Sequence, residues 1–567
     1  MVGLIRGGYI GRMVRVNLTK LKVKVEEVKP DFMVSYVGGS GWGARLIWDE
    51  VKPNVHPLSG KNKVVVATGP LTGTLVLGAC KTSLSSISPA TKLYGNSSIG
   101  GMLGVELKQS GFDALIVEGA SRKPVYLWVT DRRVEIKDAS HLWGLGCLSA
   151  EDAIRKELGD AEVSVATIGP AGENLVKFAC VMCDRGHQAG GMGIGAVFGS
   201  KKLKAIAVKG HFDIPVANME LMRSTFDRAM KYVNYEGGDG GTVRGRVRMG
   251  DASCYLCPMA CRRVNVIGKT GIKILSPEYE ETAFLSMNYV LPSMKDVVYG
   301  GWLCDELGMD VVSAGTVIAF AMECYERGLL SREELNGLDL RFGEAEDVLR
   351  LLGDVARRRG IGNLLAEGVE AAAERMGEEA IRIAMHVSGL KALGYDVKAA
   401  LATALAYATY GIGEHSDGAG AITYDLKAGR GRYTEDQAER VSYLQHVGLL
   451  LDCLGVCQLP WVRLGLNLEA YREAYEAVVG VNVTFDFLLR RGKAIYDLTR
   501  AINSLRGIYG GRGNLQPWFK HLALSGALKG LKPSEAGSEG CWTRTTRLEM
   551  GCEDRDPEEG KAYRAQA

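Results

Sequence analysis

Long hydrophobic runs and an excess of one charge are the two features that this sequence lacks. No apolar stretch reaches the roughly 18 to 20 residues that cross a bilayer, and residues 1–6 show no hydrophobic segment of the kind found in signal peptides. The 69 Lys and Arg residues nearly balance the 66 Asp and Glu residues, so no field of one sign favours nucleic acid or a membrane as partner. We therefore expect a cytoplasmic protein that binds neither.

Several familiar motifs are missing as well. The early glycine-rich segments lack the strand, G-x-G-x-x-G, helix order of a dinucleotide-binding fold, so nicotinamide is not expected. No repeat of solenoid length is present. The 13 cysteines are partly bunched, which indicates a reducing compartment and not a secreted disulfide framework. With 567 residues, 46% of them hydrophobic, the chain is long enough for about three to four domains.

The hydrophobic period changes along the chain and divides it into three parts. Residues 1–210 hold short β-like runs separated by glycine-bearing turns, which predicts a β-rich domain. Apolar residues at helical spacing follow in residues 211–392 and in residues 393–567, which predicts two mainly α-helical domains and an α+β fold. The expected strands are 63–67, 114–118, 125–129, 134–137, 163–167 and 205–208, and the expected helices are 218–233, 299–306, 314–328, 345–358, 363–376, 399–409, 435–456, 468–478 and 484–504.

A C-x2-C-x3-C run is formed by Cys254, Cys257 and Cys261, and Cys457 follows much later in the chain. This spacing brings three thiolates to one face of a small volume, and a remote fourth thiolate completes the ligands of a [4Fe-4S] cluster. A structural zinc site would show two paired C-x2-C knuckles, and a radical S-adenosylmethionine enzyme would show the order C-x3-C-x2-C. The remaining alternative is a set of buried, reduced cysteines; Pro258 and the tight spacing favour the cluster.

Two copies of the pattern D-x-L-G-[MV]-[DC] occur, at residues 305–310 and 452–457, and the second copy ends in Cys457. A carboxylate accepts two hydrogen bonds from an amino-pyrimidine edge, and a glycine lets the backbone approach a flat ring. A single copy would be interpreted as a helix C-terminus that ends in Leu-Gly. The pair, joined to the proposed fourth cluster ligand, predicts two bound rings.

Motifs spread over about residues 1 to 515 resemble the aldehyde:ferredoxin oxidoreductase family of tungsten enzymes. They are 67–74 (ATGPLTGT), 100–101 (GG), 104–108 (GVELK), 112–114 (FDA), 141–144 (HLWG), 168–174 (IGPAGEN), 195–205 (GAVFGSKKLKA) and 277–280 (PEYE). Motifs this numerous, in the family's order, argue against coincidence. The resemblance implies a β-rich base on which two pterins lie, with two helical domains that close over them and each contribute one aspartate-glycine loop.

The resemblance also implies the cofactors and the residues that hold them. The family binds tungsten, for which molybdenum is the alternative here, through four dithiolene sulfurs of two pterins whose phosphates are linked by magnesium. Lys81 falls where the family usually has an arginine between cluster and pterin, and a lysine keeps the charge but loses the planar fork. The implied cofactor-binding residues are Lys81, Asn96, Ser98, Asp305, Met309, Asp310, Asp452 and Val456, and the implied cluster ligands are Cys254, Cys257, Cys261 and Cys457.

Two glycine-rich loops depart from the family's pattern. The phosphate-facing loop 187–193 lacks the arginines that are usual there, and the loop 38–43 has Ser40 in place of a basic residue. Both changes remove positive charge from a site that is expected to hold phosphates. Backbone amides of such loops still cradle phosphate, so the cofactor remains expected.

Two further positions concern metals. Ser98 stands at the magnesium-contacting position, with Asn96 two residues before it. Members that join subunits through an iron use Glu-x-x-His shortly before the first loop, where this chain has Tyr299 and Trp302. We therefore expect no bridging iron, and any homodimer would form without it.

The family places a glutamate and a histidine beside the metal, and these fall on Glu280 and His415. Histidine titrates near neutrality and burial raises the pKa of glutamate, so the pair is able to activate water and orient a carbonyl. Without the resemblance, His415 would be a loop residue that caps a turn and Glu280 a carboxylate at a helix N-terminus. The implied reaction, in an anaerobic enzyme, is oxidation of R-CHO with water to R-COOH, with electrons passing through the cluster to ferredoxin.

Two other functions stay open. Some relatives of the family are electron-input subunits of reductase complexes that act on aromatic thioesters. A cluster-bearing protein without pterin would act only in electron transfer, and metal analysis separates this case from the others.

Two segments are not assigned to the site. Cys180, Cys183 and His187 have metal-ligand spacing, but a fourth ligand is not evident and the segment continues a strand, so we interpret it as core and turn. The tail from residue 533 to 567 has no apolar period and does not look like the family's usual end.

Overall fold

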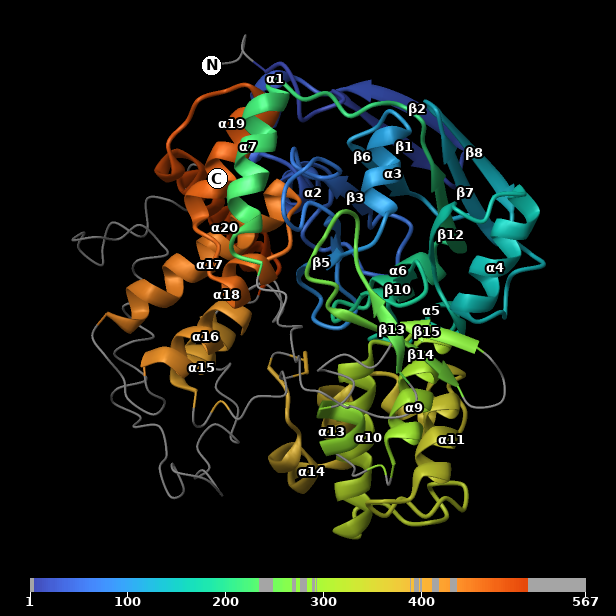
Figure 1. Cartoon of the computed structure of the whole chain (residues 1–567). Helices are drawn as coiled ribbons and strands as arrows, with labels where there is room; N and C mark the ends of the chain where they lie inside the picture. The colour runs from blue at the N-terminus through green and yellow to red at the C-terminus, as the bar shows by residue number, and fades with distance from the viewer. Residues whose placement is uncertain are drawn as a thin grey trace.

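The computed structural model describes residues 5–233, 248–267, 272–275, 283–287, 291, 293–387, 389–391, 397, 400–409, 418–428 and 436–507. A β-rich base is followed by two groups of helices, one drawn below the base and one beside it (Figure 1). The predicted α+β fold is therefore confirmed. In the part of the chain that the structure describes, no helix is long and apolar enough to cross a membrane.

The base contains two six-stranded mixed sheets with the same topology. One has the order β2-β1-β6-β3-β4-β5, and the other has the order β8-β7-β12-β9-β10-β11. Each has one parallel pair, β1 with β6 and β7 with β12, among antiparallel neighbours. The strands are β1 Arg12–Asn17, β2 Lys22–Glu27, β3 Val64–Thr68, β4 Thr82–Ile87, β5 Tyr94–Ile99, β6 Ala114–Glu118, β7 Val125–Thr130, β8 Arg133–Asp138, β9 Ser164–Thr167, β10 Val181–Cys183, β11 His187–Ala189 and β12 Leu203–Lys209.

The helices of the base follow the same repeat. α2 (Gly39–Glu50) lies between β2 and β3, as α4 (Cys147–Leu158) lies between β8 and β9. α3 (Leu103–Gln109) precedes β6, as α6 (Ile194–Ser200) precedes β12. The short helices α1 (Pro30–Tyr36) and α5 (Pro170–Glu173) complete the base. Although the sequence shows no solenoid repeat, the base is built from two copies of one unit.

The two sheets share one hydrophobic core. Val66 and Leu115 of the first sheet belong to the same buried cluster as Leu127 and Ile206 of the second. Strands β3 and β6 are buried along nearly their whole length, which explains their continuous apolar runs, VVVAT and ALIVE. The two sheets therefore form one base that presents its turns to the helices.

Three short strands, β13 (Arg248–Ala252), β14 (Arg262–Ile267) and β15 (Ile272–Leu275), form a small antiparallel sheet between the base and the first helical group (Figure 1). The cysteine run lies on the connection between β13 and β14. The first group of helices and the preceding π-helix are η3 Ala283–Met287, α9 Met294–Leu307, α10 Val311–Glu326, α11 Ala345–Ala356, α12 Gly362–Leu365, α13 Val369–Met376 and α14 Glu378–Ile383.

The second group surrounds the long helices α17 and α20, which pack against α2 of the base. Helix α7 (Met219–Met230) joins this group, because Met222 and Ala229 share a core with Tyr471 and Ala474. Helix α7, which lies in the expected second domain (211–392), therefore packs with the C-terminal helices. The helices are α15 Leu401–Thr409, α16 Gly418–Ala428, α17 Gln437–Leu454, α18 Leu459–Leu464, α19 Leu468–Val479 and α20 Phe485–Leu505.

All six strands expected in the base are present within one or two residues. Strands β4 (TSLSSI) and β5 (YGNSSI) were not predicted, because both are rich in serine, which is not typical of strands. The expected helix 363–376 is wrong as a single element. It is broken into α12 and α13, and Gly368 precedes α13 with a φ of 93° that a helix does not allow.

Candidate functional site

Helices α9 and α17 end in the two aspartate-glycine loops, here called loop 1 (305–310) and loop 2 (452–457). Gly308 and Gly455 close the two helices with φ values of 73° and 79°. The next residue then donates its N–H to a carbonyl of the preceding turn, at 2.9 Å from Met309 and 3.1 Å from Val456. Each loop is therefore a helix C-terminus as well as part of the candidate site, and its first aspartate lies in the last helical turn.

Each loop docks on a Gly-Pro turn of the base. Gly69 follows β3 and Gly169 follows β9, the equivalent strands of the repeat. A Cβ atom on Gly69 would lie 2.1 Å from the carbonyl carbon of Leu454, and one on Gly169 would lie 2.5 Å from that of Leu307. Only glycine permits backbones to approach so closely. The turns therefore fix the height of both loops above the base.

Equivalent backbone hydrogen bonds hold the opposite side of each loop to the base. Lys81 N–H donates to the carbonyl of Gly455 at 3.0 Å, and Cys180 N–H donates to that of Gly308 at 2.9 Å. The last residue of each loop also bonds to the base, Cys457 to Gly78 O at 2.8 Å and Asp310 to Phe178 O at 3.1 Å. These contacts make Lys81 and Cys180 equivalent positions in the two halves.

The first aspartate of each loop accepts a hydrogen bond from an equivalent strand. Ser98 Oγ on β5 donates to Asp452 Oδ1 at 3.2 Å, and Gln188 Nε2 on β11 donates to Asp305 Oδ1 at 2.5 Å. Both carboxylates are buried. Asn96, expected beside magnesium with Ser98, accepts a hydrogen bond from Ser85 Oγ at 2.9 Å.

Loop 2 lies in a charged environment. Burial raises the pKa of Asp452 to about 6, although Lys81 and the Ser98 hydroxyl oppose this shift. Burial disfavours the charged form of Lys81, but nearby Cys457 and other acidic groups outweigh burial and raise its pKa. Lys81 thus lies close to both Cys457 and Asp452.

The four predicted cluster cysteines gather beside loop 2. Burial, with contributions from the nearby thiols of Cys457, Cys254 and Cys261, raises the pKa of Cys257 to about 12. Cys457 Cβ would lie 3.1 Å from a Cβ on Gly78, so that glycine provides the space for it. All four side chains are half-buried.

A fourth ligand other than Cys457 was conceivable, because Cys453 lies four residues earlier in loop 2. Its Sγ atom instead contacts Ser40 Oγ at 3.3 Å, in a buried position at the start of α2. Burial raises its pKa to about 12. Cys453 is therefore a core thiol.

Two groups flank Cys254. Cys80, and to a smaller extent His187, lower the pKa of Cys254 to about 2, while burial opposes both. The Nδ1 atom of His187 lies 4.0 Å from Cys254 Sγ. Of the residues that the structure describes, no three His, Cys, Asp or Glu side chains converge closely enough to hold a single metal ion. Four soft thiol donors on a short loop and a helix end nonetheless fit an iron-sulfur cluster, which spreads its ligands over several irons.

Loop 1 ends differently. Asp310 accepts the N–H of Ser313 at 2.8 Å, which caps α10, and it forms an ion pair with Lys391 at 2.6 Å. Burial acts to raise the pKa of Asp310, but Lys391 outweighs burial and lowers it. A Cβ atom on Gly191 would lie 3.5 Å from Lys391 Nζ, so this lysine stands against the glycine loop that lacks the family's arginines.

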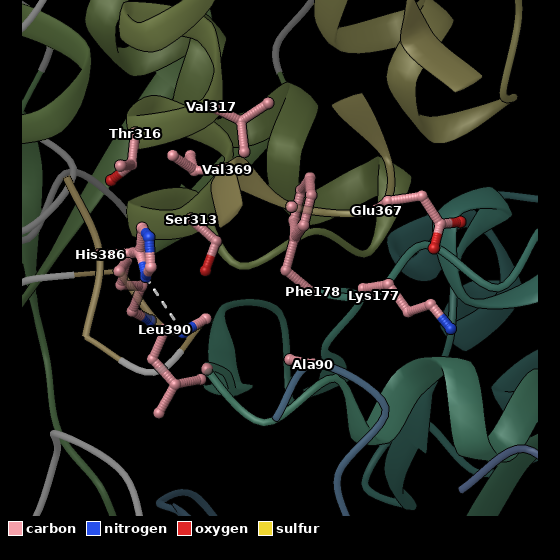
Figure 2. A pocket seen from close by; sticks show the side chains of 14 residues that line it. Ala90, Lys177, Phe178, Ser313, Thr316, Val317, Glu367, Val369, His386 and Leu390 are labelled. Atoms are coloured by element: carbon pink, nitrogen blue, oxygen red, sulfur yellow. Dashed lines mark hydrogen bonds between the residues drawn. The ribbon is translucent and has the colours of Figure 1, made fainter. Parts of the chain in front are cut away.

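A pocket lies between α10, α13 and the residues His386 and 389–391, and Ser313 and His386 lie on its wall (Figure 2). Lys391 also lines it. Gly389 N–H donates to His386 Nδ1 at 3.3 Å, the dashed line in Figure 2. Burial lowers the pKa of His386 to about 4, so its ring is neutral near pH 7.

Sequence reasoning missed Gln188, Lys391 and Cys80. Gln188 had been noted only as part of a loop without arginines, and its link to Asp305 follows from the equivalence of β5 and β11. Lys391 is distant from loop 1 in sequence, so no local pattern indicates the pair. Comparison of the two glycine turns, 67–74 and 168–174, would have revealed the repeat.

The proposed catalytic residues Glu280 and His415 lie outside the described residues, as does the tail from residue 508 onward. Met309 and Val456 are fully buried in the loops. Tyr299 and Trp302 lie on α9 with ring centroids 5.2 Å apart, where the family's iron-binding pair would stand. The predicted core-and-turn interpretation of Cys180 and Cys183 is confirmed, since both are buried and β10 and β11 form a hairpin.

Comparison with known proteins agrees with this architecture. Residues 13–210 match "Aldehyde ferredoxin oxidoreductase, N-terminal domain", and residues 195–539 match "Aldehyde ferredoxin oxidoreductase, domains 2 & 3". The chain is 34% identical over 556 residues to the tungsten-containing aldehyde ferredoxin oxidoreductase of Pyrococcus furiosus, covering 90% of this chain and 91% of that protein. It is 33% identical over 548 residues to the protein of the same name from Thermococcus kodakarensis, covering 88% and 89%.

Relatives with other names are also similar. The aliphatic sulfonate oxidoreductase, WOR-like subunit, of Pyrococcus furiosus is 31% identical over 452 residues, which are 69% of this chain and 72% of that protein. The solved active site complex BamBC of benzoyl coenzyme A reductase with 1,5 dienoyl-CoA superposes with a TM-score of 0.84 at 25% identity, covering 96% of this chain and 95% of that chain. From the two matched regions and the identity along nearly its full length, this chain belongs to the aldehyde ferredoxin oxidoreductase family of oxidoreductase enzymes.

Proposed function

We propose that this chain oxidises aldehydes to carboxylic acids with water at a bis-pterin tungsten centre, and that electrons pass through a [4Fe-4S] cluster to ferredoxin. The observation that carries the proposal is the meeting of Cys457 and Asp452 on one loop, with Lys81 beside both and the cysteine run of β13–β14 opposite. The names of the relatives support tungsten and an aldehyde substrate.

The residues present fit these groups in chemical type. Asp305 and Asp452 would accept hydrogen bonds from the two ring edges, and Met309, Asp310 and Val456 would border the rings. Lys81 would counter the negative charge of pterin and cluster, and Ser98 and Asn96 would stand near magnesium. A bound tungsten-pterin centre would supply a two-electron acceptor for the aldehyde, and a bound cluster would supply a one-electron relay.

The balanced equation of the reaction shows what the side chains have to do. R-CHO and water give R-COOH, two protons and two electrons, so two protons must leave the site. We assign His415 and Glu280 to hold these protons and to orient the carbonyl, since both are able to titrate near neutrality in a buried site. The glycine turn at Gly169 holds loop 1 against the base, and the turn at Gly69 holds loop 2.

A second candidate function is that of a tungsten-pterin subunit in a reductase complex that acts on aromatic thioesters. The specific observation in its favour is the superposition with the benzoyl coenzyme A reductase complex over 96% of this chain. Such a subunit would carry the same cofactors and work with further subunits. Ferredoxin as partner and a homodimer without bridging iron belong to the first proposal.

The test replaces Glu280 by Gln and His415 by Asn in protein purified without oxygen. Both variants should keep tungsten and iron but lose turnover of aldehydes with a low-potential acceptor by roughly 10²- to 10⁴-fold, the usual loss when general acid-base help is removed. Near wild-type rates for both would refute the catalytic assignment. A wild type that carries all metals yet oxidises none of a panel of aliphatic and aromatic aldehydes would favour the reductase subunit.

A further inference from the structure

A fifth cysteine lies at the proposed cluster. Cys80 is outside the C-x2-C-x3-C run and precedes Lys81 in the segment between β3 and β4. Its N–H donates to the carbonyl of Gly78 at 2.8 Å, the same carbonyl that accepts the N–H of Cys457. Its side chain is only 1% exposed. The backbone therefore fixes Cys80 and the fourth cluster ligand relative to each other.

The thiol of Cys80 lies beside that of Cys254, close enough for each to shift the pKa of the other. In the structure it donates to the carbonyl of Gly78, 3.4 Å from Cys80 Sγ. A thiolate bound to iron carries negative charge and attracts a donor more strongly than a neutral carbonyl does. In the loaded site, Cys254 is thus the preferred acceptor.

A second donor stands on the other side of Cys254. His187 begins β11 and is buried, and its Nδ1 lies 4.0 Å from the Cys254 sulfur. A Cβ atom on Gly100 would lie 2.8 Å from that sulfur and 3.2 Å from His187 Nδ1, so the side chains of Cys254 and His187 both pack closely against Gly100. Cys254 is therefore held between two side chains that the cluster does not need as ligands.

We propose that Cys80 donates a hydrogen bond to the sulfur of Cys254, and that this bond, with a weaker contribution from His187, raises the reduction potential of the cluster. The inference rests on the proposed function, since it requires the cluster. A reduced cluster carries one more negative charge than an oxidised one, so donors to its sulfur ligands stabilise the reduced form. Cys80 is a positioning residue for electron transfer and not a ligand, because four other cysteines supply the four corners.

The test measures the midpoint potential of the cluster by electron paramagnetic resonance during a redox titration of the anaerobically purified holoenzyme. Cys80→Ala should keep the iron content and shift the potential to a more negative value. Cys80→Ser retains a donor and should lie between wild type and Cys80→Ala, and His187→Phe should shift the potential in the same direction by less. Cys453→Ala, which removes a core thiol of loop 2, is the matched control and should equal wild type.

Each outcome decides the matter. An unchanged potential in Cys80→Ala, or equal potentials in the Ala and Ser variants, would overturn the inference. Loss of iron from folded Cys80→Ala would make Cys80 a ligand and would also overturn it. If Cys80→Ala does not fold, electron-nuclear double resonance of wild type in D2O must show an exchangeable proton near the cluster that Cys80→Ser alters, and its absence overturns the inference. A wild type without a [4Fe-4S] signal would refute the cluster itself, and with it the proposed function.

Discussion

The two halves of the base hold the two helix-ending loops in the same way. Strands β3 and β9 each lead into a Gly-Pro turn on which a loop backbone rests, and strands β5 and β11 each send a polar side chain to the first loop aspartate. Two equal half-sites are what a cofactor made of two similar rings requires. The duplication of the base thus explains why the chain carries the D-x-L-G pattern twice.

The halves differ in a few side chains. The last residue of loop 2 is Cys457, which faces the cysteine run, whereas that of loop 1 is Asp310, which caps α10 and pairs with Lys391. Lys81 beside loop 2 is replaced by Cys180 beside loop 1. The backbone therefore provides two similar positions, and under the proposed function the identity of the last loop residue determines which half would hold the cluster.

The largest expected effect comes from replacing the last residue of each loop, which distinguishes the two halves. Cys457→Ser should abolish the cluster absorbance, because a hydroxyl is a poor ligand for iron. Asp310→Ala should leave iron in place and cost about 3–5 kcal/mol of stability, because it breaks a buried ion pair. Iron content and chemical unfolding check both outcomes, with Cys453→Ser as the variant that should retain the cluster. Loss of the cluster in Cys453→Ser but not in Cys457→Ser would reverse the ligand assignment.

A smaller effect tests the similarity of the halves. Asp305→Ala and Asp452→Ala should each weaken pterin binding by about 1–3 kcal/mol, roughly 5- to 150-fold, since a buried ring edge loses its acceptor. Iron should remain. Asp347→Ala on α11, away from both loops, should retain full pterin and tungsten. Normal tungsten content in both loop variants would argue against two ring sites.

The docking turns offer a test of packing alone. Gly69→Ala and Gly169→Ala should each destabilise the protein by about 1–3 kcal/mol, because the new methyl group would meet loop backbone that has to move. Gly250→Ala is the matched control, since a Cβ there meets nothing within 4 Å and the backbone has no positive φ. Thermal unfolding compares the three variants. Equal midpoints for all three would show that the loops do not rest on the turns.

The smallest effect concerns α17, the helix that ends in loop 2. Burial, with smaller contributions from Lys493 and Arg500, lowers the pKa of His446 to about 4. Because the folded state disfavours the charged ring, stability is complete above the unfolded pKa of about 6.5 and falls as the pH drops from 6.5 to 4, by about 1–3 kcal/mol. His446→Phe keeps the ring packed on Tyr496 and should lose part of this acid sensitivity.

Urea unfolding at pH 7 and at pH 4.5 checks this prediction. The stability difference between the two pH values should be smaller in His446→Phe than in wild type. An equal difference in both proteins would mean that His446 does not contribute to acid sensitivity.

The sequence predicted most of loop 2 and less of loop 1. Cys457 and Asp452 were predicted together because they share one short motif, and Lys81 was predicted through the family resemblance. The three residues lie close together in the structure. The contacts of Lys391 and Gln188 with loop 1 depend on how distant segments pack, and neither residue belongs to a pattern that marks a charged site.

Strands show the same limit. Runs such as β3 and β6 were predicted because strands buried on both faces are continuously apolar. The serine-rich strands β4 and β5 were not, since their burial is set by neighbouring strands and by α2 and not by their own composition. Ser98 on β5 therefore entered the site only through the family resemblance, whereas the repeat gives its role a physical basis.

The most direct test of the account is the metal and pterin content of the wild-type protein purified without oxygen. A duplicated base with one cysteine-bearing half-site predicts about four irons, one tungsten or molybdenum and two pterins per chain. About four irons with neither tungsten, molybdenum nor pterin would contradict the account and would leave an electron-transfer protein.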